Sequence, residues 1–282
     1  MRLAVPNKGR LAEPSLALLR EAGFRFEAAD RRLFARCDSH ALDLLFVRAE
    51  DIPEYAQDGI ADLGITGTNL LLESGADVEV RLPLGFGRCS LRVAVPQEAS
   101  ITSPAELAGH AVATSHPQAT GRFFEGLGAS VRLIEIKGAV EVAPLIGVAD
   151  AIVDLVSTGS TLAINGLRTI ATVADFEAAL ISGWHLTQEQ SRGREQIEMA
   201  LNSVIAAGRR KYLMMNAPAA ALERIREIIP GLGAPTVMEL STPGQIAVHA
   251  VVESDLVWEL LSPLKSAGAS SILVMQIENL IP

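Results

Sequence analysis

Cysteine and aromatic residues are scarce in this chain of 282 residues, which has two cysteines and 4% aromatic side chains. Cys37 and Cys89 lie far apart and outside any CxxC pair, so we expect buried free thiols rather than a disulfide framework. The five histidines are scattered and suggest no metal site. Leu, Ile, Val and Ala must therefore supply most of the core, and a hydrophobic content of 49% is enough for one.

Long apolar runs and a surplus of positive charge are also missing. No stretch approaches the ~18 apolar residues of a membrane-spanning helix, and the first residues, MRLAVPNKGR, lack the apolar region of a signal peptide. The formal net charge is −9, whereas proteins that bind duplex nucleic acid need a positive field. We therefore expect a cytoplasmic protein with neither a membrane nor nucleic acid as partner, in which a local basic cluster can still bind an anionic substrate.

Short apolar runs alternate with helical patterns over the first two thirds of the chain, which indicates an α/β fold with mainly parallel sheets. We expect two lobes: residues 1–90 with 173–208 form lobe I, and residues 91–172 form lobe II. In such sheets ligands sit at the carboxyl ends of the strands, so the loops there are the candidates for a site. The expected strands are Arg2–Val5, Ala41–Val47, Asp62–Ile65, Leu91–Val95, Ala111–Ala113, Val131–Ile136, Ala151–Val156 and Thr169–Val173.

Residues 209–282 show a different pattern. They read strand, helix, strand, strand, helix, strand, which is the βαββαβ order of a ferredoxin-like domain. Domains of this kind often bind a regulatory ligand, although a fold alone does not prove a function.

The strongest local signal is the apolar run Ala151–Val156, which leads into Ser157, Thr158, Gly159, Ser160 and Thr161. N–H groups at the start of the helix that follows carry partial positive charge and suit a phosphate. The hydroxyls add donors, and Gly159 permits a close approach of the backbone. The alternative is a helix capped by Ser and Thr that binds no ligand, and the segment alone does not decide between the two. It is not a Walker loop, which would need GKS or GKT.

Asp150 and Asp154 stand four residues apart on or beside this strand, and they point the same way if the strand is regular. A carboxylate beside a phosphate is unusual unless it binds hydroxyl groups or a metal. Ribose hydroxyls would explain the pair, so we expect a phosphorylated sugar as ligand.

A second candidate loop, after the first strand, holds Lys8, Gly9 and Arg10. The two cations can hold a polyphosphate, Arg10 through its planar fork and Lys8 as a point charge. The alternative is a solvated basic loop. No serine, histidine and aspartate are arranged as a nucleophilic triad. His116 follows a strand and can line the cleft, although a lone histidine is more often structural.

Three other positions are weaker candidates. Thr66 and Gly67 end the strand Asp62–Ile65, where an ordinary turn is the more common explanation. Arg48 follows another strand and can reach a cleft between the lobes. Glu141 can contact a substrate, or it can have an indirect or surface role.

These loops, in this order, resemble the ATP phosphoribosyltransferase family, whose members catalyse the first step of histidine biosynthesis. The resemblance covers essentially the whole chain, and residues 138–167 are its most specific part. Because the C-terminal βαββαβ unit is present, the chain resembles the long form of the family. The matching stretches are LAVPNKGRL, VRAEDIPEYAQDGIADLGITG, VATSHP, GAVEVAPLIGVADAIVDLVSTGSTLAINGL, KYLMMNAP and GASSILVMQIENL.

The resemblance implies a bilobed, periplasmic-binding-protein-like (type II) catalytic core and a ferredoxin-like, ACT-like regulatory domain. It also implies a reaction in which N1 of ATP attacks C1 of 5-phosphoribosyl 1-pyrophosphate (PRPP) and pyrophosphate leaves, with Mg²⁺ held by the substrates rather than by a dedicated protein site. The catalytic contribution of Asp154, Arg10 and Lys8 would be to position the substrates. PRPP would be bound by Asp150, Asp154, Ser157, Thr158, Gly159, Ser160 and Thr161, and ATP or pyrophosphate by Lys8, Gly9, Arg10, Arg48, Thr66, Gly67 and Glu141.

The last domain would bind the inhibitor L-histidine near Asn216, Thr236, Val251 and Ser271. Some members of the family carry Asp at the position of Asn216, which leaves the strength of inhibition open. Homodimers and homohexamers are implied as assemblies. Two rival hypotheses remain: a bilobed ligand-binding protein without catalysis, and an amino-acid sensor with a vestigial first part. The missing signal peptide counts against the first, and the intact loops count against the second.

Overall fold

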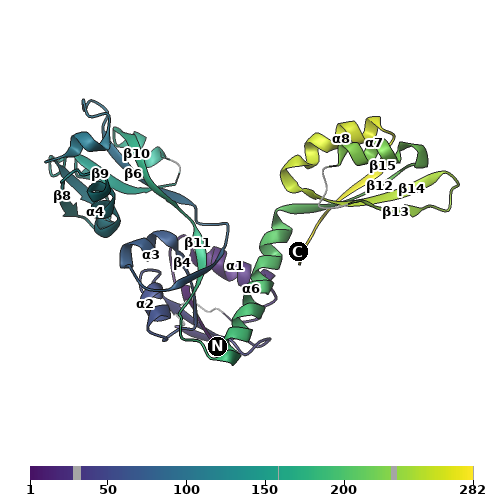
Figure 1. Cartoon of the computed structure of the whole chain (residues 1–282), viewed down its shortest axis with the longest axis horizontal. Helices are drawn as coiled ribbons and strands as arrows, with labels where there is room; N and C mark the ends of the chain where they lie inside the picture. Colours follow the sequence, from purple (N-terminus) through teal and green to yellow (C-terminus); the bar gives the residue numbers. More distant parts are fainter. Residues whose placement is uncertain (28–32, 158, 230–233, 282) are drawn as a thin grey trace. The chain divides into compact units, whose positions relative to one another are not determined.

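The structure, a computed structural model, describes residues 1–27, 33–157, 159–229 and 234–281 (Figure 1). The chain forms two compact units. The first contains Met1–Ala17 and Phe24–Arg194, and the second contains Leu18–Gly23 and Glu195–Pro282.

The first unit holds two sheets, and its N-terminal sheet has the strand order β2-β3-β1-β4-β11-β5. The central strand β1 pairs in parallel with β3 and β4, whereas β11 pairs antiparallel with β4 and β5. The strands are β1 (Arg2–Pro6), β2 (Phe34–Arg36), β3 (Asp43–Val47), β4 (Leu63–Gly67), β5 (Glu79–Pro83) and β11 (Ala178–Ser182), and the helices that follow β1, β3 and β4 are α1 (Ala12–Glu21), α2 (Ile52–Gln57) and α3 (Thr68–Ser74).

The second sheet has the order β10-β6-β9-β7-β8. Strand β7 pairs in parallel with β8 and β9, and β6 pairs antiparallel with β9 and β10. The strands are β6 (Cys89–Pro96), β7 (Ala111–Thr114), β8 (Arg132–Glu135), β9 (Ala151–Val156) and β10 (Leu167–Phe176), and the helices are α4 (Pro117–Gly126) and α5 (Ser160–Ile164).

The expectation of mainly parallel sheets is wrong, because both sheets are mixed. The chain crosses from the first sheet to the second after β5 and returns after β10. In each sheet the arriving strand, β6 or β11, is inserted antiparallel between the edge strand and its parallel neighbours. This insertion is the arrangement of a type II periplasmic-binding-protein-like core, as predicted. The predicted domain boundaries near residues 90 and 173 fall inside β6 and β10.

Aliphatic side chains fill the cores of both sheets, as the scarcity of aromatic residues predicts. Every residue of β4 is buried, and Leu3, Ala4 and Val5 of β1 have no exposed surface. Continuous apolar runs are typical of strands that are covered on both faces. Of the eight phenylalanines, Phe24 and Phe124 are among the largest fully buried side chains.

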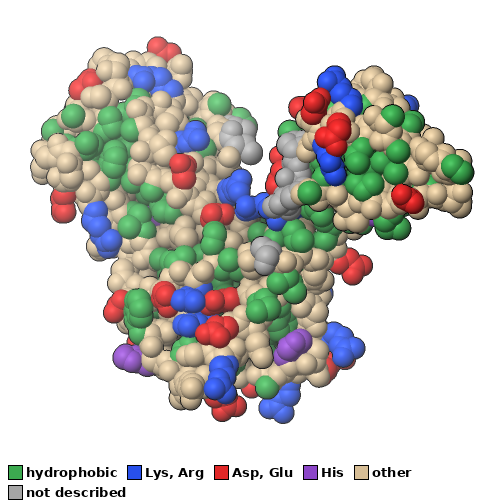
Figure 2. Space-filling view, turned by 45° about the vertical axis from the view of Figure 1, so that its right-hand side comes forward, with side chains coloured by type: hydrophobic (Ala, Val, Ile, Leu, Met, Phe, Trp, Pro, Cys, Tyr) green, Lys and Arg blue, Asp and Glu red, His purple; other side chains and the backbone are tan. Residues whose placement is uncertain are grey.

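Asp51 stands at the N-cap position of α2, with a proline at the first turn, but its side chain makes no capping hydrogen bond. Among the described helices, none is long and apolar enough to cross a membrane. On the face drawn in Figure 2, acidic and basic side chains are interspersed and form no continuous basic surface.

The second unit contains the C-terminal sheet, with the order β13-β14-β12-β15 and antiparallel neighbours throughout. This order confirms the predicted ferredoxin-like domain. Helices α7 and α8 cover one face of the sheet (Figure 1), and the core between them includes Leu213, Val248 and Leu264. The elements are α6 (Gln188–Gly208), β12 (Arg210–Pro218), α7 (Leu222–Ile228), β13 (Thr236–Glu239), β14 (Gln245–Glu253), α8 (Val257–Ser266) and β15 (Ser270–Gln276).

Candidate functional site

The strand β9, the turn after it and α5 form the strand–loop–helix that the sequence predicts. Gly159 is the N-cap of α5 and has φ +79°, a backbone conformation that a residue with a side chain rarely adopts. Thr158 and the side chain of Ser160 lie outside the described residues. A cavity of about 220 Å³ opens beside the turn. It is lined by Glu141, Asp154, Leu155, Val156, Ser157, Gly159, Thr161 and Leu162.

The structure thus brings five of the predicted residues around one cavity. Asp154 is half-buried, and its Oδ1 accepts a hydrogen bond from the Ser115 hydroxyl at 3.2 Å. Burial raises the pKa of Asp154, the backbone N–H of Leu155 and the Ser115 hydroxyl lower it, and the nearby Glu141 carboxylate raises it further. Two carboxylates in a poorly solvated cavity favour a ligand that brings hydroxyl donors or a cation.

Asp150 lies at the other end of β9. Its Oδ2 accepts the backbone N–H of Ala111, the first residue of β7, at 2.8 Å, and lies 3.3 Å from His110 Nδ1. The Ala111 hydrogen bond holds the pKa of Asp150 below its ordinary value, with a smaller contribution from His110. Four residues of strand separate Asp150 and Asp154 by about 13 Å, so the structure does not bring the two carboxylates to one cavity.

Arg10 connects the basic loop of the first sheet to the candidate phosphate loop of the second. Its Nη1 donates to Ser157 Oγ at 3.0 Å, and its Nη2 donates to Cys89 Sγ at 2.8 Å. Lys8 and Gly9 are exposed in the same loop, and Gly9 has φ +82°. The loop that the sequence marks as a candidate polyphosphate site therefore reaches Ser157, at the edge of the cavity, through one guanidinium group.

The remaining predicted residues of the first sheet have different environments. Arg48 is exposed after β3, and because Pro6 of β1 pairs with Val47, Arg48 and Lys8 follow neighbouring strands at the same edge. Thr66 is fully buried, and its hydroxyl donates to the carbonyl oxygen of Ala49 at 3.0 Å. Gly67 is buried at the N-cap of α3, where a Cβ would lie 2.4 Å from Asn69 Oδ1. The geometry of Thr66 and Gly67 supports a role in shaping this edge.

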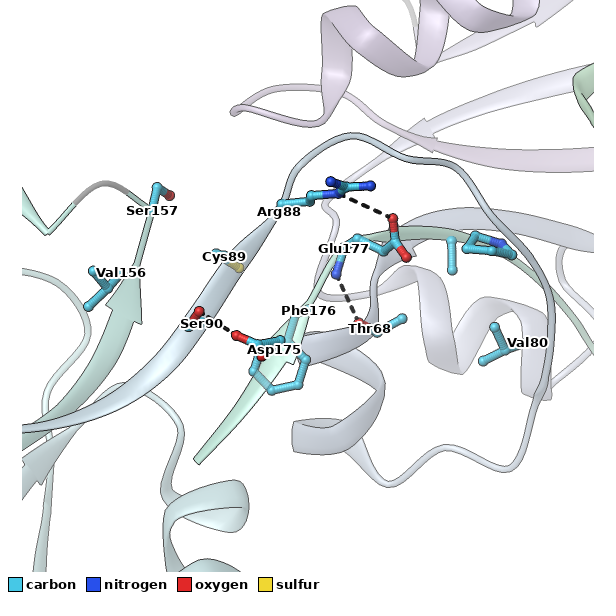
Figure 3. Close-up of a pocket in the computed structure, with 12 residues that line it drawn as sticks. Thr68, Val80, Arg88, Cys89, Ser90, Val156, Ser157, Asp175, Phe176 and Glu177 are labelled. Atoms are coloured by element: carbon cyan, nitrogen blue, oxygen red, sulfur yellow. Dashed lines mark hydrogen bonds and ion pairs between the residues drawn. The ribbon is translucent and has the colours of Figure 1, made fainter. Parts of the chain in front are cut away.

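A larger cavity of about 600 Å³ adjoins the first and shares Val156 and Ser157 with it (Figure 3). It lies where the chain crosses between the sheets, at the start of β6 and the end of β10. Arg88 Nε lies 3.9 Å from Glu177 Oε2, and the Glu177 backbone N–H donates to Thr68 Oγ1 at 3.3 Å. Sequence reasoning missed this cavity because the crossover strands read as ordinary core strands.

Sequence reasoning also missed Asn69 and Ser115, and it favoured a structural role for His116 over a place lining the cleft. In the structure both Asn69 and His116 are buried, and Asn69 Nδ2 lies 3.1 Å from His116 Nε2. Ser115 lies between His116 and Asp154. No motif marks these residues, because they come from different loops. Among the described residues, no group of three or more His, Cys, Asp or Glu side chains is arranged to hold a metal ion.

The fold and the site define a class: a type II, two-sheet core that carries a small ferredoxin-like domain, with a cavity of carboxylates and hydroxyls under a Ser/Gly loop. A family model described as ATP phosphoribosyltransferase matches residues 48–204, and one described as the HisG C-terminal domain matches residues 207–279. The chain belongs to the ATP phosphoribosyltransferase family, in the long form with a regulatory C-terminal domain, and is an enzyme of the first step of histidine biosynthesis.

Relatives that match this chain over its full length are also described as ATP phosphoribosyltransferases. The ATP phosphoribosyltransferases of Methanosarcina acetivorans and Halobacterium salinarum are 44% and 46% identical to this chain, and each comparison covers 100% of both chains. Among solved structures, the ATP phosphoribosyl transferase (HisG:HisZ) complex from Thermotoga maritima is similar with a TM-score of 0.65 and 28% identity. That comparison covers 74% of this chain and 98% of the other.

Proposed function

We propose that this enzyme transfers the 5-phosphoribosyl group of PRPP to N1 of ATP, releasing pyrophosphate and forming N1-(5-phosphoribosyl)-ATP. The observation that carries the proposal is one cavity lined by Asp154, Glu141, Ser157, Gly159 and Thr161, with the Arg10 guanidinium bonded to Ser157. A phosphorylated sugar fits these groups: its phosphate takes the loop N–H and hydroxyl donors, and its hydroxyls take the carboxylates.

The proposed reaction needs no protein nucleophile. C1 of the ribose passes through an oxocarbenium-like state, and N1 of the adenine is already nucleophilic as the neutral base. The protein contributes alignment of two substrates and neutralisation of the leaving pyrophosphate. We assign that neutralisation to Arg10 and Lys8, together with Arg48 at the same sheet edge. The larger cavity, of about 600 Å³, is of a size that suits the nucleotide.

Mg²⁺ is proposed to enter with the substrates. Asp154 and Glu141 are two carboxylates near one another, which fits a cation held mostly by phosphate and ribose oxygens and water rather than by a protein cage. When bound, the cation neutralises charge on the pyrophosphate. The described residues contribute by orienting the ribose and by holding the phosphate loop.

The basic test is product formation from ATP, PRPP and Mg²⁺. We expect a rise in absorbance from the phosphoribosyl-ATP adduct, which depends on both substrates, and one pyrophosphate released per adduct. Folded protein that binds nucleotide but forms no adduct would favour the rival hypothesis of a binding protein without catalysis.

We propose L-histidine as the effector of the C-terminal domain. The pairing of β12, β13 and β14 supports this, because Asn216, Thr236 and Val251 project from the sheet face opposite to α7 and α8. Ser271, near the start of β15, has φ +49° and lies within a register irregularity of the β12–β15 pairing, between Ser270 and Leu273. Homodimers and homohexamers are proposed as the assemblies.

Asn216→Asp is expected to strengthen inhibition by histidine, since a carboxylate would pair with the effector's ammonium group. A charge-assisted hydrogen bond of this kind should lower the half-inhibiting histidine concentration by about tenfold. The measurement is a histidine titration of the initial rate for both proteins, with the uninhibited rate as the control. Equal inhibition of the two proteins would remove Asn216 from the proposed effector site.

A further inference from the structure

A chain of hydrogen bonds, buried at Asn69 and His116 and partly buried at Ser115 and Asp154, runs from α3 beside the first sheet to β9 of the second. Asn69 Nδ2 lies 3.1 Å from His116 Nε2, and His116 Nδ1 lies 2.9 Å from Ser115 Oγ. The Ser115 hydroxyl donates to Asp154 Oδ1 at 3.2 Å. The exposed fractions of Asn69 and His116 are 6% and 7%, so water cannot readily replace these contacts.

When Asp154 is ionised, the donors in this chain point in one direction. Ser115 has a single hydroxyl proton, and because it donates that proton to Asp154, its oxygen must accept one from His116 Nδ1–H. His116 Nε2 is then an acceptor, and the Asn69 amide nitrogen opposite it can only donate. Every proton therefore points toward the Asp154 carboxylate. An imidazolium would instead place an Nε2–H against the Asn69 amide protons.

The charges around His116 come from several elements. Glu73 on α3 and Asp154 on β9 favour the charged ring, and Arg10, in the loop after β1, disfavours it. Burial is the largest effect and lowers the pKa of His116. The Glu73 carboxylate is itself bound by the backbone N–H groups of Gln118 and Ala119 at 2.9 and 3.0 Å, at the start of α4. The lowered pKa favours a neutral His116 ring, which is the form that the hydrogen bonds from Asn69 to Asp154 require.

We propose that Asn69, His116 and Ser115 are positioning residues for Asp154: the Nδ1–H tautomer of His116 directs the Ser115 hydroxyl onto Oδ1. The second carboxylate oxygen, Oδ2, then keeps a fixed orientation in which it can accept ribose hydroxyls. This inference rests on the proposed function, in which Asp154 binds the ribose of PRPP. The orientation of Asp154, in the second sheet, then depends on Asn69, which lies on the helix that follows β4 of the first sheet.

Kinetics of variants along the chain test the proposal. Ser115→Ala is expected to raise the KM for PRPP by about tenfold or more, because it removes a hydrogen bond to a charged group. Ser115→Thr, which keeps the hydroxyl, should restore most of the affinity. His116→Asn keeps a donor near the Nδ1 position and should change the KM by less than His116→Leu. The KM for ATP should change little in all four variants.

A matched control is Thr120→Val. Thr120 and Thr114 form a buried hydroxyl pair at 3.0 Å near the start of α4, and the His116 backbone N–H, rather than its ring, donates to Thr114 Oγ1 at 2.9 Å. This variant is expected to lose stability and to keep the KM for PRPP. If Ser115→Ala and Thr120→Val change the KM equally, the positioning role is overturned.

Nitrogen-15 NMR of the imidazole ring tests the tautomer directly, with His116→Asn identifying the signal among the five histidines. We expect a protonated Nδ1 and an unprotonated Nε2 at neutral pH in the wild-type enzyme. An Nε2–H tautomer, or an unchanged PRPP KM in Ser115→Ala while Asp154→Asn raises it, overturns the positioning role and leaves the proposed function intact. An unchanged PRPP KM in Asp154→Asn overturns both.

Discussion

Asp154→Asn is expected to lower kcat/KM for PRPP by about one to two orders of magnitude without lowering the stability of the fold. The activity falls because the amide replaces the charged acceptor for ribose hydroxyls, and hydrogen bonds to charged groups contribute about 1.5–3 kcal/mol each. Initial rates at varied PRPP and saturating ATP give the change in kcat/KM.

The stability of the Asp154→Asn variant should rise, or stay the same, while its activity falls. Burial raises the pKa of Asp154 in the folded state, so the protonated carboxyl is the form that folding favours. A carboxyl with a raised folded pKa disfavours the folded state once the pH exceeds its ordinary value, and the penalty is fully present above the folded pKa. At pH 7.5 the Asn variant, which carries no charge to bury, is therefore expected to unfold at the same or a higher urea concentration than the wild type.

Asp150→Asn is the matched control for this prediction. It makes the same chemical change at the other end of the same strand, where the carboxylate accepts the Ala111 N–H. We expect it to keep kcat/KM for PRPP within about threefold, which is less than the loss of one charge-assisted hydrogen bond. A large activity loss in Asp150→Asn with none in Asp154→Asn would contradict the placement of the ribose at the cavity. Parallel losses of activity and urea midpoint in Asp154→Asn would assign that residue a structural role.

Arg10→Gln is expected to lower kcat by about two to three orders of magnitude, as removal of one group that stabilises developing charge does in other enzymes. The guanidinium is already held at the phosphate loop by its bonds to Ser157 and Cys89, so it needs little reorganisation to meet charge that develops on the leaving pyrophosphate. Arg10→Lys should recover only part of the rate, because one ammonium cannot reproduce the two-pronged geometry. Single-turnover rates with both substrates bound measure the effect.

Arg36→Gln is the control for charge alone. Arg36 lies on edge strand β2 of the same sheet and pairs with Asp43 at 3.3 Å. Its replacement changes the net charge equally and should leave kcat unchanged. If the Arg10 and Arg36 variants lose the same factor, general electrostatics rather than a local contact with pyrophosphate explains the loss.

The sequence by itself predicted most of the elements, although not β2 and β5, and it predicted the nature of the candidate ligand-binding loop. The apolar run Ala151–Val156, the hydroxyl residues after it and Gly159 predict a strand, a turn and a helix from local information, because each residue's preference depends on its immediate neighbours. The same is true of the βαββαβ order of the last domain. The basic loop at Lys8 and Arg10 is visible for the same reason.

Tertiary structure alone decided which of these residues meet. The strands β6 and β11 are antiparallel because the chain crosses between sheets, and a crossing leaves no local signature in the residues. Strand pairing places Asp150 beside Ala111 and away from the cavity, although its spacing from Asp154 looked suited to a shared ligand. The contacts of Arg10 with Ser157, and of His116 with Asn69, join segments that are 147 and 47 residues apart. Spatial proximity at such separations is set by the packing of two sheets, which no local pattern encodes.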